Sequence, residues 1–315
     1  MQEKKPLIVI AGPTASGKTA LSIDLAGRIG GEIISADSMQ VYRHMDIGSA
    51  KVTPEEMQGI PHHLIDVLDP TEEFNVVVFQ KLAGEAIREI ESRGHIPVIV
   101  GGTGFYIQAL VYDIDFTETE EDSALREELA EIARLKGPGE LHRLLEEADP
   151  ASARAIHENN VKRMIRALEF YRQTGKRISE HNEQERGKES PWNLFYYVLT
   201  MERSLLYDRI NRRVDRMMEQ GLPEEVERLR QMGCRADMTS MQGLGYKELL
   251  AYLEHGGSLA ETAERIKQNT RHFAKRQLTW FRRERDVRWL YADQMSEEEM
   301  LARITEDLRT GKPER

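Results

Sequence analysis

The feature that most constrains the fold is a short apolar run, residues 7–11, which leads into a glycine loop and then into a second apolar stretch. The loop reads Gly12-Pro13-Thr14-Ala15-Ser16-Gly17-Lys18-Thr19 and matches the phosphate-binding pattern G-x-x-x-x-G-K-[ST]. Because the apolar residues after it recur at helical spacing, the stretch predicts a strand, a loop and a helix. This context disfavours a chance match on an ordinary glycine turn. The sequence therefore predicts an α/β fold with a P-loop NTPase-like parallel sheet that binds a diphosphate or triphosphate.

Two side chains of the loop add chemistry to this phosphate site. Gly12 and Gly17 allow the backbone to wrap so that its N–H groups point inward, where the helix dipole also favours anions. Lys18 supplies a positive charge for the terminal phosphates, and the Thr19 hydroxyl is placed to hold Mg²⁺ bound to them. We therefore expect Mg²⁺ as the cofactor, with Thr19 as its protein ligand.

The composition limits the other possibilities. The 315 residues are 40% hydrophobic and carry a net charge of −10, which is enough for a sizeable core in one large or two smaller domains. Cys234 stands alone, which excludes a disulfide framework and a cysteine metal site. No apolar run is long enough for a membrane span and no leader opens the chain. We expect a cytoplasmic monomer with no membrane partner.

Polar residues follow two more predicted strands, residues 32–36 and 96–100. Asp37 follows the first, and Gly101, Gly102 and Thr103 follow the second. Ligands of open parallel sheets gather at the carboxyl ends of the strands, which would place Asp37 and the Thr103 hydroxyl beside the phosphate loop. An Asp after a strand is equally typical of a helix N-cap without chemistry. The spacing fits both interpretations of Asp37.

The strand ending at Gly101 lacks the acidic residue with which a kinase or ATPase usually assists Mg²⁺. A further predicted strand, residues 60–67, carries Asp66 and could supply such an acid. Its adjacent His62 and His63 would point to opposite faces, which disfavours a shared metal ion. The missing acid is therefore only an indication against phosphoryl transfer.

The middle of the chain differs in character from both ends. Helical patterns dominate residues 117–193, residues 179–190 are a polar stretch, and residues 194–199 form the final predicted core strand. We predict a P-loop α/β core made of residues 1–116 and 194–315 and a mostly helical insertion domain at 117–193.

Two predicted helices are strongly basic although the protein is acidic. The first, residues 161–172, carries Lys162 and Arg163 opposite its apolar stripe. The second, residues 266–283, is followed by further arginines, Arg285 and Arg288, and interleaves its cations with Trp280. A charged face is usually only a solvated face. Cations with aromatic residues between them are also what nucleic-acid phosphates and bases require.

Three functions fit these features. The first is a phosphotransferase with a nucleotide in the loop and Asp37 as the base for an acceptor. The second is a transferase for which a diphosphate is the leaving group, and the third is an ATPase that binds nucleic acid. The basic helices disfavour a kinase of a small metabolite, because such an acceptor needs only one or two arginines.

The motifs taken together resemble those of the bacterial tRNA dimethylallyltransferases. Besides the loop, the resemblance rests on Ser-Ala-Asp-Ser-Met-Gln-Val-Tyr-Arg at 35–43, Met-Asp-Ile-Gly-Ser-Ala-Lys at 45–51 and His-His-Leu-Ile-Asp at 62–66. It continues with Gly-Gly-Thr-Gly-Phe-Tyr at 101–106, Met-Gln-Gly-Leu-Gly-Tyr-Lys-Glu at 241–248 and Lys-Arg-Gln-Leu-Thr-Trp-Phe-Arg at 275–282. The motifs span nearly the whole chain in order, and the departures, Ser49 for Thr and Val52 for Pro, touch no proposed chemistry.

This resemblance implies transfer of a dimethylallyl group from its diphosphate to N6 of the adenosine 3′ to the anticodon of tRNA. Asp37 matches the base of the family, and Thr103 and Arg213 would assist at the diphosphate. A kinase of a small acceptor, using ATP, is the alternative. The diphosphate would be held by Gly12, Pro13, Thr14, Ala15, Ser16, Gly17, Lys18 and Thr19, with Mg²⁺ on Thr19.

The resemblance also implies contacts with the anticodon stem-loop of tRNA. The target adenine must leave its stack before N6 can react, and Gln40 would help to hold it. The basic helices would grip the stem-loop. The implied RNA-contacting residues are Asp37, Ser38, Met39, Gln40, Thr103, Arg126, Val161, Lys162, Arg163, Met164, Ile165, Lys275, Arg276, Gln277, Trp280 and Arg282.

Overall fold

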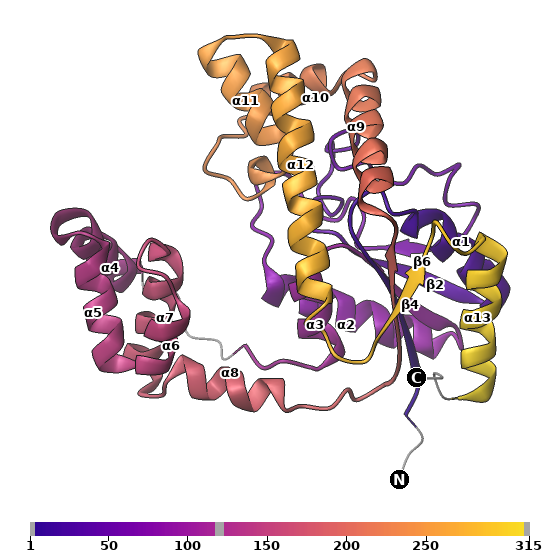
Figure 1. The fold of residues 1–315 in the computed structure, drawn as a ribbon, viewed down its shortest axis with the longest axis horizontal. Coiled ribbons are helices and arrows are strands. Elements are labelled where there is room, and N and C mark those ends of the chain that lie inside the picture. The colour runs from indigo at the N-terminus through magenta and orange to yellow at the C-terminus, as the bar shows by residue number, and fades with distance from the viewer. Residues whose placement is uncertain (1–3, 117–122, 312–315) are drawn as a thin grey trace. The chain divides into compact units, whose positions relative to one another are not determined.

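The computed structural model describes residues 4–116 and 123–311, so the start of the predicted insertion, residues 117–122, lies outside the described part (Figure 1). The chain divides into two compact units. The larger unit comprises Met1–Val111 and Ser190–Arg315, and the smaller unit comprises Tyr112–Glu189.

The larger unit is built on one parallel sheet with the strand order β3-β2-β4-β1-β5-β6. Every pairing in this sheet is parallel, from Ile33 opposite His62 at one edge to Val198 opposite Trp289 at the other. The strands are β1 (Pro6–Ala11), β2 (Gly31–Ala36), β3 (His62–His63), β4 (Ile96–Gly101), β5 (Asn193–Thr200) and β6 (Val287–Tyr291). Because all strands run the same way, their carboxyl ends share one edge of the sheet.

Helices cover both faces of this sheet (Figure 1). Ile8 and Ile10 of β1 pack into a core that also includes Leu21 and Leu25 of α1 and Ile304 of α13. On the other side α2 and α3 lie against β4. The helices of this unit are α1 (Lys18–Ile29), α2 (Val76–Ser92), α3 (Gly104–Val111), α9 (Arg203–Glu219), α10 (Leu222–Gln231), α11 (Tyr246–His255), α12 (Leu259–Phe281) and α13 (Glu297–Thr310), with a short 3-10 turn η1 (Ser240–Gln242).

Two strand predictions for this unit are wrong. Residues 60–67 form only the two-residue β3, because Leu64 and Asp66 adopt positive φ and the segment then bonds to Gln40 and Val41 instead of β2. The sheet also continues beyond β5 to β6, which the sequence analysis treated as part of the basic region. Arg288 of β6 pairs with Asp307 of α13, so its charge is compensated inside the fold.

The smaller unit is entirely helical in its described residues. Leu129, Leu141, Leu145 and Leu168 form its core. Residues 178–186 form a helix, within the stretch that the sequence marks only as polar. Its Glu185 is buried and accepts a hydrogen bond from the Asp115 N–H. The helices are α4 (Ser123–Lys136), α5 (Pro138–Ala148), α6 (Pro150–Ala155), α7 (Val161–Thr174) and α8 (Ile178–Arg186).

Among the helices of residues 4–116 and 123–311, none has both the length and the apolar character needed to cross a membrane.

Candidate active site and nucleic-acid interface

Four neighbouring strands deliver the predicted site residues to one edge of the sheet. The phosphate loop follows β1, Asp37 follows β2, Thr103 follows β4, and Arg213 lies on α9, the helix after β5. These strands are adjacent in the order β2-β4-β1-β5. The carboxyl edge of a parallel sheet is where such folds bind ligands. Sheet order alone therefore places residues that are far apart in the sequence around one location.

The phosphate loop has the conformation its glycines require. Gly12 and Gly17 have φ of 146° and 98°, and a Cβ on Gly12 would lie only 2.6 Å from the Leu199 carbonyl oxygen. The Ser16 N–H donates to the Pro13 carbonyl at 3.3 Å. Within the described residues, the N–H groups of Gly17, Lys18 and Thr19 meet no acceptor. These donors lie at the N-terminus of α1, which makes them available to an anion.

Lys18, Arg213 and Asp37 form the charged centre of the site. The pKa of the Lys18 ammonium is lowered from 10.5 to about 7, first by burial and then by the positive charge of Arg213, while Asp37 opposes both. Burial likewise lowers the pKa of Arg213, again opposed by Asp37. Two cations held together in a desolvated site favour the binding of a polyanion. The negative charge would offset both the desolvation of the cations and their mutual repulsion. In the structure the Lys18 Nζ donates to the Pro13 carbonyl at 2.7 Å.

The two oxygens of the Asp37 carboxylate differ in their contacts. Oδ1 accepts the Met39 N–H at 2.8 Å and the Gln40 N–H at 3.4 Å, which forms an Asx turn. No helix begins in the described residues between β2 and β3, so Asp37 is not a helix N-cap. No described residue donates a hydrogen bond to Oδ2. One oxygen therefore orients the carboxylate while the other is left for a substrate. Across the site, the Thr103 N–H donates to the Ala36 carbonyl at 3.3 Å, which fixes Thr103 beside Asp37.

A buried carboxylate that the sequence analysis missed supports the segment after Asp37. Glu225 of α10 accepts the N–H groups of residues 46, 47 and 48 at 2.8–3.0 Å, and the Tyr246 hydroxyl at 2.7 Å. A Cβ on Gly48 would lie 2.5 Å from the Tyr246 ring, so only glycine fits there. Burial and Glu225 raise the pKa of Tyr246 well above its ordinary value. The motifs at 45–51 and 241–248 thus meet each other in the fold.

Gln40 also belongs to this supporting network. Its Oε1 accepts the Ser35 hydroxyl at 3.1 Å, and its Nε2 donates to the Ala50 carbonyl at 3.2 Å. Its predicted contact with the target base would therefore have to compete with bonds inside its own segment.

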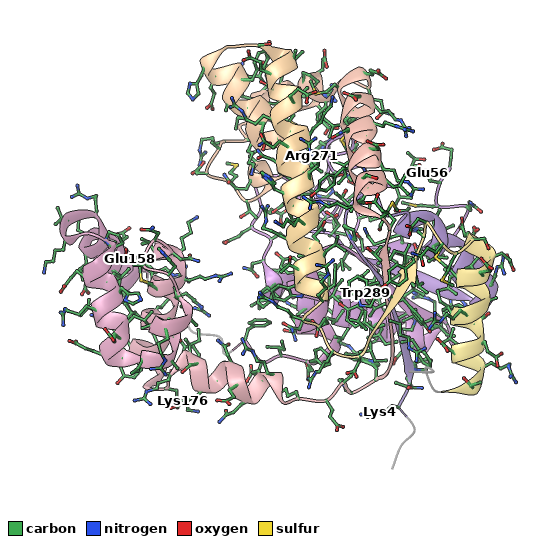
Figure 2. The ribbon with its side chains drawn as sticks, in the orientation of Figure 1. Lys4, Glu56, Glu158, Lys176, Arg271 and Trp289 are labelled. Atoms are coloured by element: carbon green, nitrogen blue, oxygen red, sulfur yellow. The ribbon has the colours of Figure 1, made fainter. Side chains whose placement is uncertain are left out.

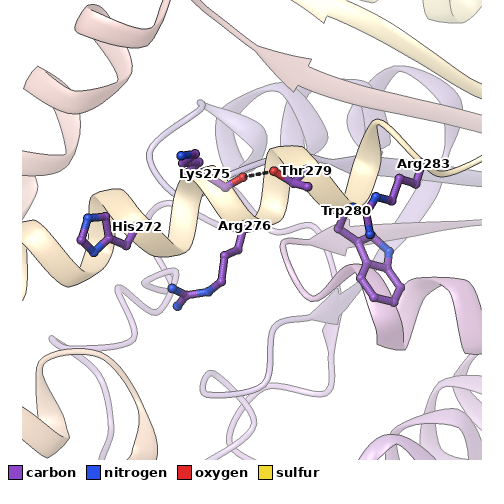
Figure 3. A pocket seen from close by; sticks show the side chains of 6 residues that line it. All are labelled: His272, Lys275, Arg276, Thr279, Trp280 and Arg283. Atoms are coloured by element: carbon purple, nitrogen blue, oxygen red, sulfur yellow. Dashed lines mark hydrogen bonds between the residues drawn. The ribbon is translucent and has the colours of Figure 1, made fainter. Parts of the chain in front are cut away.

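One side of α12 carries an open cationic groove. The groove has a volume of about 390 Å³, and Figure 3 shows the side chains that line it: His272, Lys275, Arg276, Thr279, Trp280 and Arg283. Lys267, Arg271 and Lys275 are spaced four residues apart on this helix, but only part of this row is available to a ligand. Lys267 is paired with Asp215 and Glu264, and Arg271, which lies between α12 and α9 in Figure 2, donates to Asn211. Lys275 is exposed.

In the smaller unit, α7 presents part of its predicted RNA-contacting set to solvent. Lys162 and Arg163 are exposed, and Val161 and Ile165 are half-buried. Met164 is fully buried in the core of the unit, so its side chain offers no surface for the predicted contact. Arg126 forms two hydrogen bonds with the buried carboxylate of Glu169, at 2.8 and 3.1 Å, so its guanidinium already has an anionic partner.

Gln277 also differs from its predicted role on α12. Its side chain is only 7% exposed, whereas its neighbours Lys275 and Arg276 are exposed. The amide faces the phosphate loop and the end of β4, where it bonds to Thr14 and Gly102. Of the other predicted residues, Ser38 and Met39 are half-buried beside Asp37, Trp280 is half-buried, and Arg282 is exposed.

Comparison with known families identifies the class of protein that carries this site. A family model described as IPP transferase matches residues 40–284, which is more than half of the chain. The chain belongs to this family. A second model, described as isopentenyl transferase, matches residues 5–69, the part that includes the phosphate loop and Asp37. The resemblance inferred from the motifs is therefore confirmed.

Members of the IPP transferase family match over nearly the full length. The tRNA dimethylallyltransferase of Lachnoclostridium phytofermentans is 59% identical over 286 residues, 91% of each chain. That of Carboxydothermus hydrogenoformans is 53% identical over 312 residues, 98% of this chain and 97% of the relative.

Solved structures of tRNA-modifying transferases are also similar to this chain over nearly its full length. The tRNA isopentenylpyrophosphate transferase of Bacillus halodurans is 46% identical with a TM-score of 0.73 and covers 98% of each chain. A eukaryotic dimethylallyltransferase, captured acting on tRNA, is 31% identical with a TM-score of 0.82 over 98% of this chain and 80% of its own. The predicted α/β fold class is confirmed.

Proposed function

We propose that the protein transfers a dimethylallyl group from dimethylallyl diphosphate to N6 of the adenosine 3′ to the anticodon in tRNA, releasing diphosphate. The observation that carries this proposal is the meeting of Lys18, Arg213 and Asp37 at the end of one sheet. Two desolvated cations suit a departing polyanion, and a carboxylate beside them suits a reaction that releases a proton.

Asp37 acts as the general base. The exocyclic amine of adenine is a weak nucleophile because its lone pair is delocalised into the ring. As the N6–C1 bond forms, the C1–O bond to diphosphate breaks and its electron pair leaves with the diphosphate. N6 would then carry a positive charge, so its proton passes to Oδ2, while Oδ1 stays bound to the backbone of Met39 and Gln40.

The leaving diphosphate is stabilised by donors that are fixed before the reaction. Two kinds of group lie at the loop. They are the N–H groups of Gly17, Lys18 and Thr19 and the positive charges of Lys18 and Arg213. Such preorganised groups stabilise charge that develops in the transition state. Thr103, held beside Asp37, would add its hydroxyl to the same group. The loop in this account holds a leaving group and passes no phosphate to an acceptor.

The loop also fits Mg²⁺ as the cofactor. Thr19 is exposed at the start of α1, and no described residue takes a hydrogen bond from its hydroxyl, so this oxygen can enter a Mg²⁺ shell with oxygens of the diphosphate. When bound, the ion would neutralise part of the charge on the leaving group.

The tRNA would bind through the cationic surfaces of α12 and α7. Exposed cations on these helices are suited to phosphate contacts along the anticodon stem-loop. They are Lys275, Arg276 and Arg282 at α12 and Lys162 and Arg163 on α7. The half-buried Trp280 offers an aromatic surface beside these cations, where an unstacked base could pack. Flipping the adenine costs a few kcal/mol, which contacts with the rest of the stem-loop can offset. We propose that the protein acts as a cytoplasmic monomer.

A product analysis tests this function. Labelled dimethylallyl diphosphate is incubated with total tRNA that lacks the modification, and the tRNA is digested to nucleosides. The proposal expects one labelled nucleoside, N6-(dimethylallyl)adenosine, in amounts equal to released diphosphate. A kinase of a small acceptor, the alternative, would instead transfer phosphate from ATP without RNA and leave the tRNA unlabelled.

A substitution of Asp37 separates its role as base from its role in holding the turn. Asp37→Asn keeps an oxygen for the two N–H groups but removes the basic carboxylate. We expect the single-turnover transfer rate to fall by about two to four orders of magnitude, a typical effect of removing a general base. Affinity for tRNA should change little. A rate near that of the unmodified protein would mean that Asp37 only holds the turn through Met39 and Gln40.

A further inference from the structure

The amide of Gln277 joins three elements of the larger unit. Its Oε1 accepts the Thr14 N–H at 3.1 Å, and its Nε2 donates to the Gly102 carbonyl at 2.9 Å. The side chain reaches from α12 to the phosphate loop and to the end of β4. A Cβ on Gly102 would lie 2.2 Å from Nε2, so glycine is required for this approach. The amide oxygen therefore accepts from the phosphate loop, and the amide nitrogen donates to the backbone that follows β4.

The surroundings of Gln277 show that α12 is packed directly on both segments. Ala15 of the phosphate loop and Leu278 of α12 pack against one small cluster that includes Ala274. One turn further on, the Trp280 indole covers Gly104, where a Cβ would lie 2.3 Å from the ring. The buried side of α12 therefore contacts the diphosphate loop, while its exposed side carries the cationic groove.

We propose that Gln277 is a positioning residue for the diphosphate site and makes no contact with RNA. This inference rests on the proposed function. By holding the Thr14 N–H, the amide fixes the first turn of the loop, so that the N–H groups of residues 17–19 point at the diphosphate. By holding the Gly102 carbonyl, it fixes the backbone that presents Thr103. Diphosphate affinity and the transfer rate therefore depend on Gln277, and tRNA affinity does not.

The chemistry of the position requires one donor and one acceptor. Gln277→Met keeps the length of the side chain but leaves the Thr14 N–H and the Gly102 carbonyl without partners. Gln277→Glu can still accept the Thr14 N–H, but its ionised form faces the Gly102 carbonyl and the diphosphate with a negative charge. Protonation of that carboxyl would restore the missing donor.

The test measures binding of inorganic diphosphate and of tRNA separately, with the full chain. For Gln277→Met we expect diphosphate affinity about tenfold weaker, since a buried hydrogen bond contributes roughly that factor, and tRNA affinity within about twofold of the unmodified protein. Gln268→Met is the matched control, an exposed glutamine on the same helix, and should change neither affinity. A tRNA affinity that falls while diphosphate affinity is kept would overturn the proposal and return Gln277 to RNA contact.

The pH dependence of Gln277→Glu separates positioning from a general loss of packing. The ratio of its diphosphate affinity to that of the unmodified protein should rise as the pH falls from 8 to 5.5, because the protonated carboxyl regains the donor. A ratio that is low at every pH would indicate only disturbed packing and would contradict the proposal. Product formation by the unmodified protein is scored in parallel, so failure of the proposed function is seen independently of these affinities.

Discussion

Binding of the diphosphate should take up a proton at Lys18. Burial and Arg213 lower the pKa of this ammonium from 10.5 to about 7, so the free protein holds much of Lys18 in its neutral form above that pH. An anion that contacts Lys18 stabilises the charged form and raises its pKa. With a pKa of about 7 in the free protein and near the ordinary value in the complex, uptake is about 0.9 proton at pH 8 and about 0.5 at pH 7.

Calorimetric titration with inorganic diphosphate in buffers of different ionisation enthalpy measures this uptake. The slope of the observed enthalpy against the buffer enthalpy gives the number of protons directly. At pH 8 inorganic diphosphate still holds its last proton, which it can release on binding to cations, so the contribution of Lys18 is the difference in proton number between the unmodified protein and Lys18→Met. This difference should be about 0.9 proton, and it should be the same when Lys81→Met, which lacks an exposed lysine of α2, takes the place of the unmodified protein. A difference near zero at pH 8 would refute the inference that Lys18 is desolvated and contacts the diphosphate.

Three further outcomes follow from other parts of the fold. Glu225→Gln should lower the free energy of unfolding by roughly 2–3 kcal/mol, because charged acceptors of buried N–H groups contribute about that much; chemical denaturation measures this loss. The same change should slow the transfer, because Glu225 holds residues 46–48 of the segment that follows Asp37, and single-turnover rates measure this effect. Glu32 has its pKa lowered to about 2, first by its hydrogen bonds from Arg93, so its contribution to stability is present above pH 4.5 and lost as the pH falls toward 2. Glu32→Gln should therefore destabilise the protein at pH 7 and flatten this acid-dependent loss, and an unchanged denaturation profile between pH 5 and 2 would contradict the assignment. Replacing Lys162 and Arg163 together by Ala should reduce the slope of log affinity for tRNA against log salt by about two; an unchanged slope would mean that this face is only solvated.

Local patterns predicted the elements whose determinants lie close together in the sequence. The strand, loop and helix around Gly12 to Thr19 are fixed by apolar residues and glycines within one short stretch. Ser296 and Glu299 lie three residues apart and form the capping box of α13. By contrast, β6 escaped prediction because its arginine is compensated by Asp307, a partner on another element.

The sequence predicted those parts of the site that directly follow the parallel strands. Asp37, Thr103 and the phosphate loop meet because parallel strands share an edge, which the sequence pattern already implies. Gln277 was assigned to RNA because the family resemblance maps residues 275–282 onto an RNA-contacting segment, yet it falls on the apolar stripe of α12 with Ala274 and Phe281. Glu225 likewise lies on the buried face of α10 beside Leu222 and Val226. A polar residue on an apolar stripe is the signal that could have found both, since such a group must have a buried partner.

The central claim is that the phosphate loop holds a leaving group. Dimethylallyl diphosphate with an isotopic label in the oxygen that bridges carbon and phosphorus tests it most directly, because the label reports which bond breaks. The account predicts that, in the presence of unmodified tRNA, all of the label leaves with the diphosphate, in step with formation of N6-(dimethylallyl)adenosine. Label retained on the five-carbon fragment would show cleavage between oxygen and phosphorus, and would contradict the account.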